Sequence, residues 1–141
     1  MATTFTASSQ SATPRRVHVG AFPVRATYTA GGTTISTSDI VLCMKIPTGT
    51  WVLDGYMSGT AGSGASNLKV GLGSTDNNLL SLGTLSATAG IKRFDGGTLP
   101  IKVSVSDDAT TRYQYVFITH NGGSLTATHS IQVVVWCAVD P

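Results

Sequence analysis

Side chains that could act as acids, bases or metal ligands are few in this sequence and stand far apart. The three histidines, His18, His120 and His129, lack the HxH or HExxH spacing of metal-binding motifs. A zinc site needs three or four convergent donors, and this spacing does not provide them. His120 and His129 flank Asn121-Gly122-Gly123, and we interpret them as solvated residues beside a hairpin turn. The histidines therefore predict no metal site.

The carboxylates also fail to form a recognisable catalytic or metal-binding group. All seven acidic residues are Asp, and only Asp107 and Asp108 are adjacent. Together with Asp76 or Asp95 they could offer oxygen ligands to calcium, but the spaced acidic loop ending in Glu is missing. We interpret them as a charged turn. Without Glu, and without a Gly-x-Ser-x-Gly nucleophile elbow, the sequence predicts no catalytic residues, no metal and no cofactor, so we expect a protein that is not an enzyme.

Cys43 and Cys137 each lie inside an apolar run, with neither a CxxC partner nor a neighbouring His. We interpret them as two buried free thiols; a disulfide between the two runs is the alternative. The first residues lack the basic and apolar regions of a signal peptide, which favours synthesis in a reducing cytoplasm. No apolar stretch approaches the roughly 20 residues of a membrane span, so we expect no membrane partner.

Low charge is the most unusual feature of the composition. Only 11% of the 141 residues are charged, and the net charge is +2. The nine basic residues are dispersed, whereas a nucleic-acid footprint requires clustered Lys and Arg, so we expect no nucleic-acid partner. A surface with so little charge must be polar and uncharged or covered by partners, which predicts an oligomer.

The elements that must position these side chains are strands. Short β-type runs alternate with clusters of Gly, Asp, Asn and Thr, a spacing that predicts about eight strands in a sandwich or barrel. The runs are Val24–Thr29, Asp39–Ile46, Thr50–Met57, Leu68–Leu72, Ile91–Phe94, Leu99–Val105, Tyr113–Thr119 and Ser130–Val139.

Three further segments differ from this simple alternation. Ser130–Val139 is apolar on both sides after Gln132, which predicts a central strand with both faces covered, one of them by a core or a subunit interface. Its Trp136 is expected in the core. Ser58–Asn67 reads as a glycine-rich loop. Asn77–Leu85 reads as one helical turn, or as a loop that holds leucines against a sheet edge.

Residues 1 to 20 are rich in Thr, Ser and Ala and precede the regular alternation, so we expect an extended N-terminal arm followed by one domain over residues 21–141. The arm either docks on a neighbouring subunit or is a floppy terminus. Arg15 and Arg16 lie at its end. They and Trp51, at a strand start after a predicted turn, are our candidates for contacts with partner chains.

Two segments carry a family resemblance. Met44–Gly55 contains Ile-Pro-x-Gly followed by Val-x-Asp, and Leu68–Asp76 reads Leu-x-Val-Gly-x-Gly-x-x-Asp. This pattern resembles small virion proteins of tailed bacteriophages, of the capsid decoration (cement) or head-fibre type. The resemblance implies an all-β, single-domain antiparallel β-sandwich of the jelly-roll type that forms homotrimers.

The same resemblance implies a structural role in the virion, after synthesis in the host cytoplasm. The partners would be further copies of the chain and the major capsid protein or other virion proteins. Arg15, Arg16 and Trp51 would then be candidate subunit or capsid contacts. The alternative is a carbohydrate- or receptor-binding module of a phage fibre or tail on the same sandwich. Exposed aromatics with Asp or Asn in one concave site would favour that alternative, because fold alone does not decide function.

Overall fold

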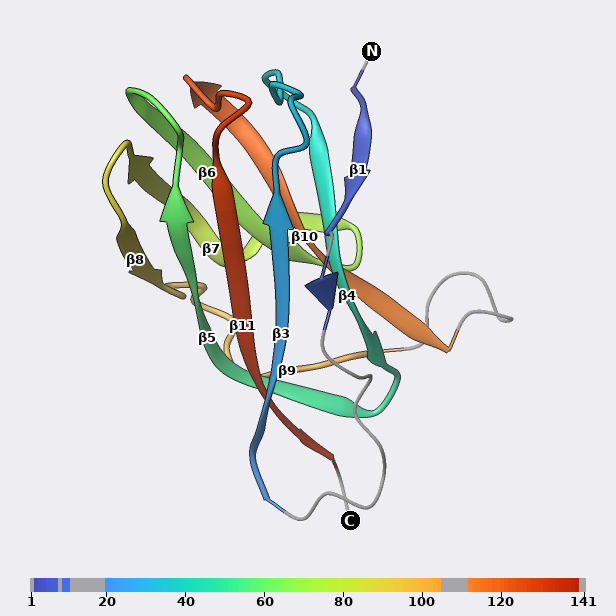
Figure 1. Ribbon diagram of the computed structural model, residues 1–141. Coiled ribbons are helices and arrows are strands. Elements are labelled where there is room, and N and C mark those ends of the chain that lie inside the picture. The colour runs from blue at the N-terminus through green and yellow to red at the C-terminus, as the bar shows by residue number, and fades with distance from the viewer. Residues whose placement is uncertain (1, 8, 11–19, 105–111, 140–141) are drawn as a thin grey trace.

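The computed structural model describes residues 2–7, 9–10, 20–104 and 112–139, and these form strands and loops (Figure 1). No helix long and apolar enough to cross a membrane occurs among them. The strands are β1 (Thr4–Thr6), β2 (Ser9–Gln10), β3 (Phe22–Thr29), β4 (Ile40–Pro47), β5 (Thr50–Thr60), β6 (Ala65–Leu72), β7 (Thr75–Ser86), β8 (Gly90–Arg93), β9 (Ile101–Lys102), β10 (Tyr113–Gly123) and β11 (Ser130–Val139).

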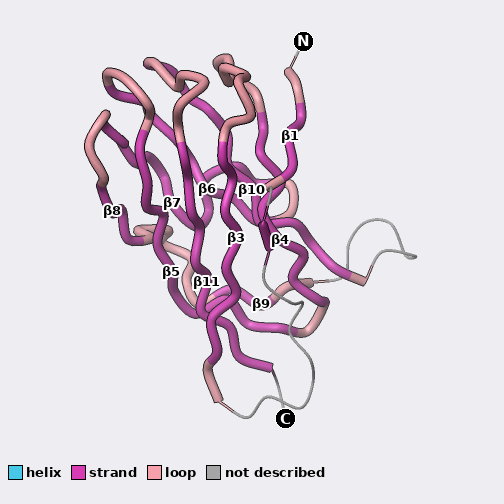
Figure 2. Tube along the Cα trace, in the orientation of Figure 1, coloured by secondary structure: helices cyan, strands magenta, loops and turns pink. Residues whose placement is uncertain are grey.

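The strands form two sheets that face each other (Figure 2). The β10 sheet has the order β1-β4-β10-β6-β7, and the β11 sheet has the order β2-β3-β11-β5-β8, with β9 also paired to β5. All pairs are antiparallel except β1 with β4. The predicted all-β antiparallel sandwich is therefore confirmed. The described residues hold eleven strands where about eight were predicted, and the additional ones are β1, β2 and β7.

The strand pairs are nested along the chain. Leaving aside the short β1, β2 and β9, the first strand pairs with the last (β3 with β11) and the second with the second-last (β4 with β10). The third then pairs with the sixth (β5 with β8), and the fourth with the fifth (β6 with β7). Two further pairings, β11 with β5 and β10 with β6, join these hairpin-like pairs into two sheets. β11 is thus a central strand, as its apolar sequence predicted.

The core lies between the two sheets and follows the period of two along each strand. On β11 the side chains of Ile131, Val133, Val135 and Cys137 point inward and are at most 1% exposed. Cys43, on the other sheet, is also a buried free thiol. Burial raises the pKa of both thiols to about 12. These thiols therefore act as small apolar core groups, as expected.

Asn77–Leu85 is not a helical turn or a loop, as predicted, but part of β7, the edge strand of the β10 sheet. Its register with β6 shifts between Leu68 and Val70 and again between Val70 and Leu72. Such bulges place extra residues in one strand and interrupt the alternation of sides. Adjacent Leu79 and Leu80 are both buried for this reason. Because the period of two is interrupted here, the sequence pattern did not predict the strand.

Within the expected N-terminal arm, the structure describes residues 2–7 and 9–10, which include two short strands. β1 pairs with β4 and β2 pairs with β3, so the segment closes one edge of each sheet of its own chain. Buried Asp39 accepts hydrogen bonds from the N–H groups of Thr3 (2.7 Å) and Ser36 (2.8 Å). The bond from Thr3 is the main cause that holds the pKa of Asp39 below its usual value. Phe5 packs edge-on against the ring of Tyr28.

The interpretation of His120 and His129 as solvated turn residues is wrong. β10 continues through Gly123, and both side chains are buried, His120 at 3% and His129 at 0% exposure. The His129 ring stacks on Tyr28, and its Nδ1 hydrogen-bonds the carbonyl of Thr126. Burial lowers the pKa of His129, which means that the folded protein resists its protonation.

One prediction concerns Gly55, which faces the core where the Phe94 ring is inserted. A Cβ at Gly55 would lie 2.4 Å from both Phe94 Cε2 and the carbonyl oxygen of Val134, so the Gly55→Ala variant must displace the ring or the sheet. We expect a loss of about 1–3 kcal/mol in the free energy of unfolding, measured in urea. Gly97→Ala is the control, because nothing lies within 4 Å of its Cβ. Equal stability of the two variants would contradict this packing.

A second prediction concerns acid. Because the pKa of His129 is lowered on folding, the unfolded chain binds this proton more readily. The contribution of His129 to stability is therefore complete above the unfolded pKa of about 6.5 and declines as the pH falls below it. Urea unfolding between pH 7.5 and pH 5 should show a decline that is smaller in His129→Phe, which keeps a ring against Tyr28. The same slope in both proteins would exclude His129 as its source.

Candidate functional site

The outer face of the β11 sheet carries an ordered set of side chains that the core does not use. Directly opposite residues on antiparallel neighbours point to the same side, so the register of β3, β11, β5 and β8 arranges this face in rows. One row is Pro23, Trp136 and Asp54; the next is Arg25, Val134, Tyr56 and Arg93; the third is Thr27, Gln132, Ser58 and Ile91. We call the first two rows together with Ile91 the tryptophan face.

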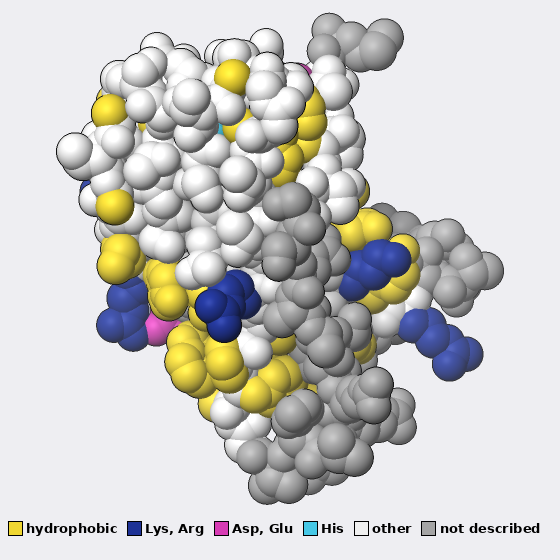
Figure 3. Space-filling view, viewed as in Figure 1, with side chains coloured by type: hydrophobic (Ala, Val, Ile, Leu, Met, Phe, Trp, Pro, Cys, Tyr) yellow, Lys and Arg dark blue, Asp and Glu magenta, His cyan; other side chains and the backbone are white. Residues whose placement is uncertain are grey.

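Large apolar side chains are exposed on the tryptophan face. Ile91 is 71% and Trp136 40% exposed, and they are two of the three large hydrophobic residues exposed in the described part of the chain. Val134, between the flanking strands, is buried. Figure 3 looks onto this side of the molecule: in the lower half, hydrophobic side chains lie beside basic and acidic ones, while the upper half shows few charged groups.

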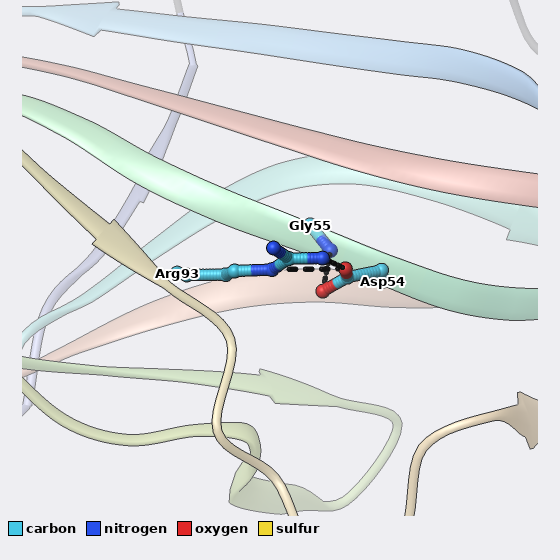
Figure 4. A network of polar contacts seen from close by, with 3 residues as sticks. All are labelled: Asp54, Gly55 and Arg93. Atoms are coloured by element: carbon cyan, nitrogen blue, oxygen red, sulfur yellow. Dashed lines mark hydrogen bonds and ion pairs between the residues drawn. The ribbon is translucent and has the colours of Figure 1, made fainter.

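A shallow hollow of about 200 Å³ lies in the tryptophan face. It is lined by Asp54, Gly55, Tyr56, Ile91, Arg93 and Trp136. Arg93 reaches from β8 to β5 and donates to Asp54 Oδ2 through Nε at 3.0 Å and through Nη2 (Figure 4). Oδ1 of Asp54 accepts the N–H of Gly55 at 2.8 Å. The guanidinium is thus oriented over the hollow while its side chain stays 80% exposed.

The outer face of the β10 sheet has a different character. Lys45 Nζ lies 4.5 Å from the centroid of the Tyr113 ring and 5.7 Å from that of Tyr115. Lys69 and Asp76 form an ion pair at 3.4 Å. The cation and the aromatic rings on this side are therefore engaged with one another. In the described ranges, no three His, Cys, Asp or Glu side chains are grouped so as to hold a metal ion.

Of the three predicted contact residues, the structure describes Trp51, whose role in a partner contact stays a prediction. Arg15 and Arg16 lie outside the described residues. Trp51 is half-buried on β5, with Lys102 Nζ 5.6 Å from its ring centroid, and the register opposes it to Ala138, one row beyond Trp136. It does not line the hollow.

The expectation that Trp136 lies in the core is wrong. On β11, Val133, Val135 and Cys137 take the inner side, so Trp136 falls on the outer one. Strict alternation counted from these three residues is the sequence signal that could have identified Trp136.

Comparisons with known proteins give structural matches. No protein-family model matches the sequence, and no curated protein sequence does. A chain from the capsid of Ralstonia phage GP4 aligns with a TM-score of 0.72 and 13% identity, over 93% of this chain and 92% of that one. A chain from the cyanophage Pam1 capsid asymmetric unit aligns with a TM-score of 0.64 and 19% identity, over 94% and 99%. At these identities the likeness shows a shared β-sandwich fold.

The pairing of Arg93 with Asp54 gives a prediction for the site. The hydrogen bond from Arg93 is the main cause that lowers the pKa of Asp54. In Arg93→Ala we expect the pKa of the Asp54 carboxyl, followed by NMR titration, to rise toward its usual value. Lys69→Ala, which removes the ion pair on the opposite sheet, is the matched control and should leave Asp54 unchanged. An unchanged Asp54 pKa in Arg93→Ala would show that the pair does not persist in solution.

Proposed function

We propose that this chain is a structural protein of a bacteriophage virion, of the capsid decoration (cement) type, that assembles with copies of itself and with other virion proteins. The observation that carries the proposal is the whole-chain structural match to chains of two phage capsids. Each alignment covers at least nine-tenths of both chains, so the matched chains are about as long as this one. The proposal places the protein in the virion and gives it no catalytic role.

The nested strand pairing supports a jelly roll as the particular kind of sandwich. A jelly roll contains eight strands in two sheets and two Greek keys, and it recurs in viral capsid proteins and in lectins. Here eight strands pair first with last, second with second-last, third with sixth and fourth with fifth. When strands paired in this nested way fold into two facing sheets, the sheets have the strand orders β3-β11-β5-β8 and β4-β10-β6-β7, as observed here.

A carbohydrate- or receptor-binding module of a phage fibre or tail is the second candidate. One observation favours it: Trp136, Tyr56 and Asp54 line the same hollow. Aromatic rings with a few convergent polar groups are typical of ligand sites. The hollow of about 200 Å³ is below the usual 300–1,000 Å³ of such sites, and an aliphatic side chain, Ile91, is the most exposed large hydrophobic group at its rim. These two properties suit a protein contact better than a sugar.

The proposed function is tested by locating the protein in purified particles. Mass spectrometry of particles purified on a density gradient should find the chain at many copies per particle, and labelling with a specific antibody should place it on the capsid by electron microscopy. Light scattering of the purified protein should give about three times the chain mass of 14.5 kDa. Labelling of fibres or tails would favour the second candidate, and absence from the particles would overturn the proposal.

A further inference from the structure

We propose that the tryptophan face is the surface by which this chain docks on a different virion protein, and that the matching surface is apolar and bears carboxylates. The inference rests on the proposed function and names the part of the molecule that performs it. It follows from the exposure, the charge and the rigid placement of the side chains on the outer face of the β11 sheet.

The side chains at the centre of this face are of the types that contribute most to binding at protein interfaces. Energetically dominant residues at protein interfaces are enriched in Trp, Tyr and Arg. Trp136, Tyr56 and Arg93 lie together at the hollow, beside Ile91, whose side chain is largely exposed. The uncharged polar residues Thr27, Gln132 and Ser58 continue the face on one side. An apolar centre beside a polar margin is the usual anatomy of a protein interface.

The backbone holds these groups in fixed positions before binding. β11 and β5 are hydrogen-bonded on both of their edges, β11 to β3 and β5, and β5 to β11 and β8. Trp136 and Tyr56 lie on these two strands, and Arg93 is oriented by Asp54. A side chain placed in this way loses little freedom on association, so less of the interaction energy is spent on ordering it.

The charges indicate which partner fits. Among the described residues, two guanidiniums, those of Arg25 and Arg93, and one carboxylate, that of Asp54, belong to the face, so the sum of these charges is positive. A second copy that presented the same face would bring arginines toward arginines, an arrangement that disfavours self-pairing. A partner with carboxylates around an apolar group would be attracted instead. We therefore assign the face to a different virion protein and not to the same face of a second copy.

The test uses virus particles assembled without this chain and the purified chain added back to them. Binding is measured by co-sedimentation over a range of protein concentrations and at two salt concentrations. The variants are Trp136→Ser and Arg93→Glu. The matched controls lie on the other sheet: Leu82→Ser removes a hydrophobic side chain that is 50% exposed, and Lys45→Glu reverses an exposed cation. Circular dichroism and thermal midpoints verify that each variant is folded.

We expect Trp136→Ser and Arg93→Glu each to weaken particle binding by about tenfold or more, while the controls bind as the wild type does. Added salt should weaken the particle binding of the wild type more than that of Arg93→Glu.

Normal particle binding by both Trp136→Ser and Arg93→Glu would overturn the proposed docking site and leave the proposed function standing. Failure of the wild type to bind would overturn the proposed function and the docking site with it. A changed oligomeric mass in Trp136→Ser would assign the face to self-association, and inhibition by millimolar glucose, galactose or glucuronate would assign it to a saccharide.

Discussion

The pairing of β11 on both of its edges is the constraint on which the rest of this structure depends. The last strand of the chain lies between β3, the first long strand, and β5. Its inward side chains, from Ile131 to Cys137, supply the most deeply buried row of the β11 sheet. Because a shift of one residue would turn that row outward, the core fixes the register of β11 against both neighbours. The same register then fixes what lies opposite Trp136 on the outer face, namely Pro23 and Asp54.

Closing the sheet edges is the second requirement, because unpaired strand edges invite association with other chains. Here the N-terminal segment closes one edge of each sheet, and Asp39 ties it to the sandwich through the N–H of Thr3. The opposite edge of the β11 sheet is β8, which is four residues long and carries Lys92 and Arg93. A short, charged edge strand is a common protection against strand addition. This protection applies to the β8 edge of the β11 sheet, whereas the β10 sheet ends in β7, an edge strand of twelve residues.

The surface side chains decide the function of a protein with this fold, because the same β-sandwich occurs in viral capsid proteins and in lectins. The two outer faces differ in how their groups are used. On the β10 sheet, Lys45 lies over the tyrosine rings and Lys69 pairs with Asp76, so these groups are largely engaged within the molecule. On the β11 sheet, Trp136 and Ile91 are exposed beside an arginine whose orientation is fixed. Arg93 is paired with Asp54 as Lys69 is with Asp76, so among the described residues the two sheets differ mainly in their exposed large hydrophobic side chains, two on the β11 sheet and Leu82 on β7. This difference supports the proposed docking face.

The sequence by itself determined the fold class, the low charge, the burial of the two cysteines and the bounds of β11, because period-two patterns and turn residues are local signals. It predicted neither β7, whose bulges break that period, nor the burial of His129, which depends on stacking with the distant Tyr28. The sequence also did not predict the candidate site, because its residues come from strands that are distant from one another in the chain. Alternation along β11 could have placed Trp136 on the outer side, but the residues beside it, the arginines included, follow from the register between strands far apart in the chain, and only tertiary packing decides that register.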